Sequence, residues 1–289
     1  MISFNTMSLQ GLASAAKSLS KYQWGAWSLV SLYISIGSGI VVALQYDLSS
    51  PFYSSTALDL LVPYGEFARS VHFYSSQFFF LFSCIHLIAI FEKTDEYTFY
   101  NWAILIISLP TAIFLLFTGY VLRGDSTGFS AGMIAEAILE NIPLVGDSLN
   151  HLFFAISDRG MQRVYVHHVI TLDVLWLILV WDHLRRYRIK VSNHIPLICL
   201  TFGFCLIIPA PIDPEKLGVT YISGPWFFLG LQELLRYFHP LFAGVIVPIA
   251  FVFALVRMRK GEKYFHIILY FIYTWLALYL ILTTIAWLR

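Results

Sequence analysis

The stretch from Arg69 to His86, RSVHFYSSQFFFLFSCIH, decides the fold, because it carries two histidines inside a long run of apolar and small residues. A second stretch, RVYVHHVITLDVLWLILVWDHLRR from Arg163 to Arg186, repeats this pattern. His72 and His86 are fourteen residues apart, and His168 and His183 are fifteen apart. At about 3.6 residues per turn and ~1.5 Å rise, each pair lies near one helix face, roughly 21–22 Å apart.

Two such helices side by side would place the four histidines in two facing couples at two depths. This is the geometry for holding two haems by paired imidazoles, one above the other across a membrane. For any single histidine the alternative is an interhelical hydrogen bond, but two matched pairs favour iron ligation. His167 stands beside His168. We favour His168 as the ligand, because it lies about 60° off the face of His183, against about 160° for His167.

The composition indicates a membrane protein. Hydrophobic residues make up 58% of the chain and charged residues only 12%, whereas about a quarter of a soluble domain is charged. Runs of about 20 apolar residues span a bilayer, and such spans must be helical because lipid leaves backbone groups no other partners. We therefore predict an all-α, polytopic transmembrane bundle with seven spans, at about residues 25–45, 71–91, 102–122, 165–184, 195–211, 241–257 and 265–287.

The distribution of lysine and arginine predicts the orientation. The N-terminal segment and the second, fourth and sixth loops hold eleven of these residues, and the opposite side holds seven. Because cytoplasmic loops are enriched in positive charge, we expect a cytoplasmic N-terminus, an outer C-terminus and residence in the inner membrane of a prokaryote. Residues 1–23 are expected to form an amphipathic helix on the inner surface.

Other motifs narrow the function. No basic run suggests nucleic-acid binding, and the three cysteines form no CxxC or CxxCH motif, so neither a cysteine metal site nor covalent haem attachment is expected. Gly25 and Gly39 repeat the fourteen-residue spacing in the first span. Glycine would let a flat macrocycle approach the helix closely, although simple helix packing is the alternative. Arg69, one turn outward from His72, is placed to pair with a haem propionate or to reach lipid headgroups.

Taken together, these residues resemble the cytochrome b family of quinol-oxidising bc and bf complexes over nearly the whole chain. The resemblance is carried by the histidine pairs, by the glycines of the first span, and by further motifs: Arg69-Ser70-Val71-His72, Gly119-Tyr120-Val121-Leu122, Ile142-Pro143-Leu144-Val145-Gly146 and Arg163-Val164-Tyr165. The fifteen-residue spacing of the second pair, with Asp125 and Gly128, is similar to the plastoquinol and menaquinol branch.

The resemblance implies two domains, a four-helix dihaem domain at 1–190 and a three-helix domain at 191–289. It implies two b-type haems, an outer low-potential one and an inner one, with quinone or quinol as substrate. Rieske-type iron–sulfur or c-type cytochrome subunits are the implied partners, with membrane lipid around the chain and a homodimer as the implied assembly. The implied iron ligands are His72 and His168 for the outer haem and His86 and His183 for the inner one. Arg69 and Arg163 would face the outer propionates, and Gly25, Gly39 and Gly119 would pack against the haems.

Two departures from the family pattern stand out. The family's outer quinol site carries a Pro-Glu-Trp-Tyr motif, and this chain has Gly224-Pro225-Trp226-Phe227 in that register, without the carboxylate. Quinol oxidation needs a proton acceptor, so Glu233 is the candidate catalytic residue, with Glu136 and Glu140 as alternatives. Leu105 stands where the third span usually has a haem-packing glycine.

Three hypotheses follow. The leading one is a dihaem subunit of a quinol-oxidising electron-transfer complex, active as an enzyme only within that complex. The second is a haem-bearing anchor that relays electrons between quinone and an extracytoplasmic iron–sulfur or multihaem partner, without quinol oxidation at the outer face. The third is a transporter without haem, for which Asp173 and Asp182 in the fourth span would be the substrate or proton sites, because carboxylates are costly in a membrane.

Overall fold

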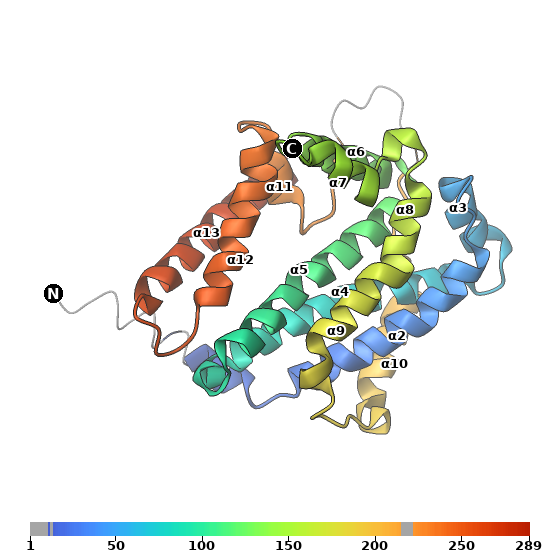
Figure 1. Cartoon of the computed structure of the whole chain (residues 1–289). Helices are drawn as coiled ribbons and strands as arrows, with labels where there is room; N and C mark the ends of the chain where they lie inside the picture. The colour runs from blue at the N-terminus through green and yellow to red at the C-terminus, as the bar shows by residue number, and fades with distance from the viewer. Residues whose placement is uncertain (1–10, 12–13, 215–221) are drawn as a thin grey trace.

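The structure, a computed structural model, describes residues 11, 14–214 and 222–289, and this part of the chain is helical without any strand. Residues 14–19 are helical, whereas the first ten residues of the predicted surface helix lie outside the described part. The helices run side by side as a bundle with short helices across one end (Figure 1).

Four membrane-length segments form the core of the bundle. They are α2 (Trp24–Gln45), α4 (Gly65–Ala89), α5 (Phe99–Leu122) and the pair α8 (Met161–Val166) and α9 (Leu172–Leu184), which a π-helical turn at His167–Thr171 joins into one rod. The contact between α2 and α4 is the most extensive of all. Buried Ser28, Ser31 and Ser75 lie on these two helices, and small side chains let membrane helices approach closely.

Short helices cover the end of the bundle that carries His72 and His168, which we call the outer end after the predicted orientation; the end with His86 and His183 is the inner end. These helices are α3 (Pro51–Leu61), α6 (Ser126–Glu140) and α7 (Gly146–Phe153). Asp125 caps α6, because its side chain accepts a hydrogen bond from the Gly128 amide at 2.8 Å. Arg123 pairs with Asp125 and, at 3.1 Å, with Asp213, which ties the start of α6 to the later chain.

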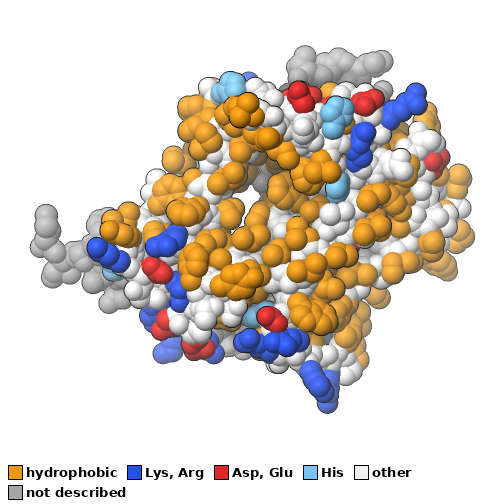
Figure 2. Space-filling model, viewed as in Figure 1, with side chains coloured by type: hydrophobic (Ala, Val, Ile, Leu, Met, Phe, Trp, Pro, Cys, Tyr) orange, Lys and Arg blue, Asp and Glu red, His pale blue; other side chains and the backbone are white. Residues whose placement is uncertain are grey.

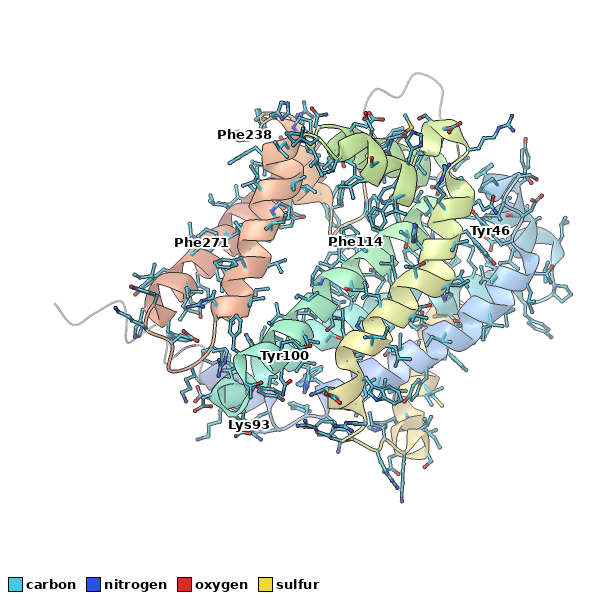
Figure 3. The ribbon with its side chains drawn as sticks, viewed as in Figure 1. Tyr46, Lys93, Tyr100, Phe114, Phe238 and Phe271 are labelled. Carbon is cyan, nitrogen blue, oxygen red and sulfur yellow. The ribbon has the colours of Figure 1, made fainter. Side chains whose placement is uncertain are left out.

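The remaining helices pack around this core. They are α10 (Ile195–Ile207), which packs on α4, the short α11 (Leu229–Leu234), and α12 (Val247–Arg257) and α13 (Phe265–Trp287). α12 and α13 form a hairpin beside α5, and the space-filling view shows a hollow between this hairpin and the bundle (Figures 1 and 2). Phe114, which is 53% exposed, lies on the part of α5 that borders this space (Figure 3).

The surface has the pattern of a membrane protein. Hydrophobic side chains cover the middle of the molecule, and charged side chains gather towards its two ends (Figure 2). Within the described residues, five helices are long and apolar enough to cross a membrane, and Val191–Ile207 and Phe242–Arg257 are shorter apolar helices. The all-helical fold is confirmed, and the number of seven spans stays a prediction. The sixth segment is interrupted by a second π-helical turn, Phe242–Ile246, followed by Pro248 in the first turn of α12.

Candidate functional site

Four histidines form two pairs inside the bundle. The ring centroids of His72 on α4 and His168 in the π-helical turn are 6.1 Å apart. Those of His86 on α4 and His183 on α9 are 6.2 Å apart. Two imidazoles that bind one metal ion from opposite sides, each at roughly 2 Å, have centroids about 6 Å apart. Each pair therefore has the separation that one shared iron requires.

The two histidine pairs suit an iron ion whose remaining ligands come from a bound macrocycle. Among the residues that the structure describes, no group of three or more His, Cys, Asp or Glu side chains could hold a bare metal ion. Two axial imidazoles are sufficient where a macrocycle supplies the remaining nitrogens, as in haem. The donor set of this chain thus fits haem iron.

The structure distinguishes His168 from its neighbour His167. The Nε2 atom of His167 donates a hydrogen bond to the Leu152 carbonyl at 2.8 Å, and its ring lies 5.2 Å from that of Phe153. His167 therefore faces the short outer helix α7, whereas His168 faces His72. The assignment of His168 as the iron ligand stays a prediction.

The two outer imidazoles are held by hydrogen bonds at Nδ1. The Nδ1 atom of His72 lies 2.8 Å from the Ser35 carbonyl on α2, and that of His168 lies 3.0 Å from the Thr118 hydroxyl on α5. An Nδ1–H donor fixes the tautomer in which Nε2 is free to bind a metal. Sequence reasoning missed Ser35 and Thr118, and the one available signal was that Thr118 directly precedes Gly119.

Three glycines lie directly against imidazoles. A Cβ atom added at Gly39 would lie 2.8 Å from His72 Cε1, and one at Gly119 would lie 2.9 Å from His168 Cε1. At Gly25 the nearest atom would be His86 Cε1 at 3.1 Å. These glycines therefore make room for the ligand rings themselves.

The inner pair borders a cavity of about 400 Å³. Its wall includes Gly25, His86 and His183, together with aromatic side chains such as Trp102 and Trp176. Leu105, which stands where the family usually has a haem-packing glycine, lies in the same wall. The cavity is mainly apolar, which suits the macrocycle of a haem.

The two arginines differ in their surroundings. Arg69 donates to both carboxylate oxygens of Asp59 at 2.6 Å and to the carbonyls of Ala210 and Pro211. Its guanidinium therefore ties α3 and the segment after α10 to α4, and a propionate contact stays a prediction. Arg163 has a buried Nη1 atom without a hydrogen-bond partner among the described residues. A buried unpaired donor is costly, so an anionic group such as a propionate fits beside Arg163.

Glu233, the candidate proton acceptor, lies fully buried on α11. Its carboxylate lies 3.0 Å from Arg289 Nη2 and accepts a hydrogen bond from the Tyr237 hydroxyl at 3.1 Å. The other carboxylate oxygen, Oε2, has no hydrogen-bond partner within the described part of the chain, and Arg236 Nε lies 3.9 Å from it. Glu233 thus joins α11 to the end of α13.

The alternative carboxylates, Glu136 and Glu140, also accept hydrogen bonds. Glu136 accepts hydrogen bonds from Ser157 and Asn150, and Asn150 also donates to Glu140 at 3.0 Å. Burial opposes ionisation of Glu136, but the bonds from Ser157 and Asn150 outweigh it and hold the pKa of its carboxyl below the usual value. Glu136 is therefore a poor proton acceptor near neutral pH.

The segment in the register of the family's outer quinol motif is aromatic. Trp226 donates to the Gln77 side chain at 2.8 Å, and Phe227 and Phe228 pack against a buried apolar cluster of α5, α6 and α8. The ring centroids of Phe228 and Phe117, a residue of that cluster, are 5.2 Å apart. Aromatic rings rather than a carboxylate therefore occupy this part of the outer end.

The two acidic residues of α9 differ in their surroundings. Asp182 pairs with Arg185 at 2.9 Å, and both side chains are more than half exposed. Asp173 is half-buried, and no described side chain or backbone group bonds to it. Among the described residues, neither carboxylate belongs to a group that could hold a metal ion.

Comparisons with known proteins show the family of this chain. The family described as Cytochrome b/b6/petB matches residues 9–190. Cytochrome b6 of Heliomicrobium gestii is 24% identical over 177 residues, which cover 57% of this chain and 81% of that protein. Cytochrome b of Apis mellifera ligustica is 22% identical over 269 residues, which cover 78% of this chain and 69% of that protein.

A solved structure shares the fold. A chain of a structure titled "Hyperthermophilic respiratory Complex III" superposes with a TM-score of 0.66 at 19% identity, covering 90% of this chain and 83% of that one. The family match spans more than half of the sequence, and all four histidines and the three glycines lie inside it. The chain is therefore an integral membrane protein of the cytochrome b family, a membrane electron-transfer subunit of the bc/bf type.

Proposed function

We propose that this electron-transfer subunit holds two b-type haems and moves electrons across the membrane between a quinone pool and a partner redox subunit. The observation that carries the proposal is the pair of imidazole couples, with ring centroids 6.1 and 6.2 Å apart, inside a bundle of membrane-length helices. Haem iron supplies one-electron transfer, and the protein sets ligation, burial and potential.

Each residue of the site has a defined task in this proposal. His72 and His168 bind the outer iron, and His86 and His183 bind the inner iron. Gly39 and Gly119 leave space for the outer ligand rings, and Gly25 does so for an inner ring. The cavity beside His86 and His183 would hold the inner haem, and quinone would exchange electrons with that haem from the inner end. Arg163, with its unpaired Nη1 atom, offers a positive charge to an outer propionate.

Redox difference spectroscopy of the purified protein tests the proposal. We expect two b-type haems, resolved as two components in a potentiometric titration. His72→Ala should remove only the outer component, and His86→Ala only the inner one. His167→Ala is the matched control, since His167 bonds to the Leu152 carbonyl and should leave both components in place. A preparation without haem, or a single haem lost in both histidine variants, would refute the proposal.

A second candidate function is favoured because the carboxylates at the outer end are either replaced or already bound by other side chains. Pro225 replaces the expected carboxylate, Glu233 is bound by Arg289 and Tyr237, and Glu136 is bound by Ser157 and Asn150. We therefore propose, as the alternative, a relay that exchanges electrons with quinone at the inner end and with an extracytoplasmic iron–sulfur or multihaem partner at the outer end.

Reduction by a quinol analogue separates the two candidates. If the outer end oxidises quinol through Glu233, Glu233→Gln should abolish rapid reduction of the outer haem while both haems remain bound. Under the relay hypothesis, reduction proceeds from the inner haem and is unchanged in the variant. Asp147→Asn serves as the control, because Asp147 is an exposed carboxylate on α7 at the same outer end.

A further inference from the structure

The hydrogen bonds behind the histidines differ between the two ends of the bundle. Both outer rings have acceptors at Nδ1: the Ser35 carbonyl for His72, and the Thr118 hydroxyl beside the Leu115 carbonyl for His168. The inner rings of His86 and His183 have no such acceptor among the described residues. The two proposed haem sites therefore differ in whether the described residues provide a hydrogen-bond acceptor at Nδ1 of the ligand histidines.

Thr118 is arranged to accept a hydrogen bond from His168. Its hydroxyl donates to the Phe114 carbonyl at 2.8 Å, with the Leu115 carbonyl at 3.1 Å. Because its one proton is used within α5, the oxygen meets His168 Nδ1 at 3.0 Å as an acceptor. Thr118 is buried, with 3% exposure, so water does not compete for this bond.

We infer that Thr118 is a positioning residue that acts through His168 to hold the ligand ring and to lower the midpoint potential of the outer haem. A hydrogen bond accepted from Nδ1–H makes the imidazole more basic. A more basic ligand stabilises the ferric state relative to the ferrous state, and hydrogen bonding around ligands is one of the levers on a haem potential. The inference rests on the proposed ligation by His72 and His168.

The test is a potentiometric titration of the intact protein with Thr118→Val and Thr118→Ser. Valine keeps the β-branched shape and removes the hydroxyl acceptor, so that His168 keeps the Leu115 carbonyl alone of these two acceptors, whereas serine keeps the hydroxyl. In Thr118→Val we expect the outer haem alone to shift to higher potential, seen as a several-fold rise in its reduced-to-oxidised ratio at fixed potential. A tenfold rise would correspond to about 59 mV for one electron. Thr118→Ser should restore the wild-type potential.

Thr111→Val is the matched control. Thr111 is buried on the same helix, with 5% exposure, and its hydroxyl bonds only to the Ile107 carbonyl at 3.0 Å. This variant should leave both potentials unchanged. The inference is wrong if Thr118→Val leaves the outer potential unchanged, or if Thr111→Val or Thr118→Ser shifts it equally.

A second measurement is needed if Thr118→Val weakens haem binding. The electron paramagnetic resonance spectrum of the ferric outer haem reports the ligand-ring orientation, and it should change in Thr118→Val and Thr118→Ala but remain in Thr118→Ser. An unchanged spectrum in both valine and alanine variants would contradict the positioning role. The proposed function itself fails separately, because wild-type protein without two b-type haems would refute it before any variant is made.

Discussion

At the scale of single residues, the distances from Gly39 and Gly25 to the histidine rings predict effects of different size for alanine substitutions. A Cβ atom at Gly39 would lie 2.8 Å from His72 Cε1, and His72 is fixed by its bond to the Ser35 carbonyl. At Gly25 the nearest atom of His86 would be 3.1 Å away, and no hydrogen bond within the described residues holds that ring. Overpacking costs about 1–3 kcal/mol, or roughly 5- to 150-fold in an equilibrium constant.

We therefore expect Gly39→Ala to lower the occupancy of the outer haem strongly, and Gly25→Ala to keep the inner haem with an altered spectrum. Haem content per protein measures both. Gly37→Ala is the control on the same helix, because an added Cβ there meets nothing within 4 Å. Equal effects of the three variants would show that the glycines matter for the helix and not for the ligand rings.

Glu136 gives a prediction about pH. Its folded-state pKa lies below the usual value, because hydrogen bonds from Ser157 and Asn150 outweigh the cost of burial. A depressed carboxyl pKa stabilises the fold above the unfolded pKa of about 4.3, and this contribution is lost as pH falls through the folded pKa. Glu136→Gln should cost about 1–3 kcal/mol at neutral pH. The difference in melting temperature from wild type should shrink towards pH 3, and a constant difference would contradict this account.

At the scale of elements, the π-helical turn reconciles the two histidine spacings. Residues His167–Thr171 form this turn between α8 and α9. A π-helical bulge accommodates one extra residue in a helix. The fifteen residues from His168 to His183 can therefore match the fourteen from His72 to His86, so that both pairs have the same offset, about 40° short of four full turns.

Deleting Ile170 tests this explanation. Ile170 is 56% exposed within the π-helical turn, and its removal should convert the turn to α-helix and leave both haems bound. Deleting Leu81, which is 40% exposed on the regular helix α4, is the control. That deletion rotates one end of α4 by about 100° relative to the other, so at least one haem should be lost. The explanation would be contradicted if absorption spectra showed haem loss in the Ile170 deletion and both haems in the Leu81 deletion.

The sequence predicted the helices and the histidine couples because both follow from local periodicity. Apolar runs of membrane length and histidines at four-turn spacing are visible in a single segment, as at His72 and His86. The π-helical turn was not predictable, because residues 167–171 contain neither proline nor glycine. The Ser35 carbonyl and the partner of Arg69, Asp59, were missed because they lie on other helices and become neighbours only after packing.

At the scale of the whole molecule, the proposed function gives the two predicted domains unequal importance for haem binding. All four histidines and the three glycines belong to residues 1–190. Residues 191–289 supply contacts at both ends of the bundle: the Leu255 carbonyl accepts from Trp102 at 3.2 Å, and the Ala210 carbonyl accepts from Arg69 at 2.6 Å. The exposed basic segment 185–190 joins the two parts.

A chain divided after Lys190 tests whether these parts are domains. Exposed polar loops tolerate a break, so co-expressed fragments 1–190 and 191–289 should copurify with the haem content of the intact protein. Fragment 1–190 alone should retain the inner haem, because His86, His183 and Gly25 all lie within it. It should bind the outer haem more weakly, because Arg69 on α4 loses the carbonyls of Ala210 and Pro211 while it keeps Asp59. Fragments that bind no haem even together would show that the bundle needs a continuous chain at this point, and a division into domains after Lys190 would then be wrong.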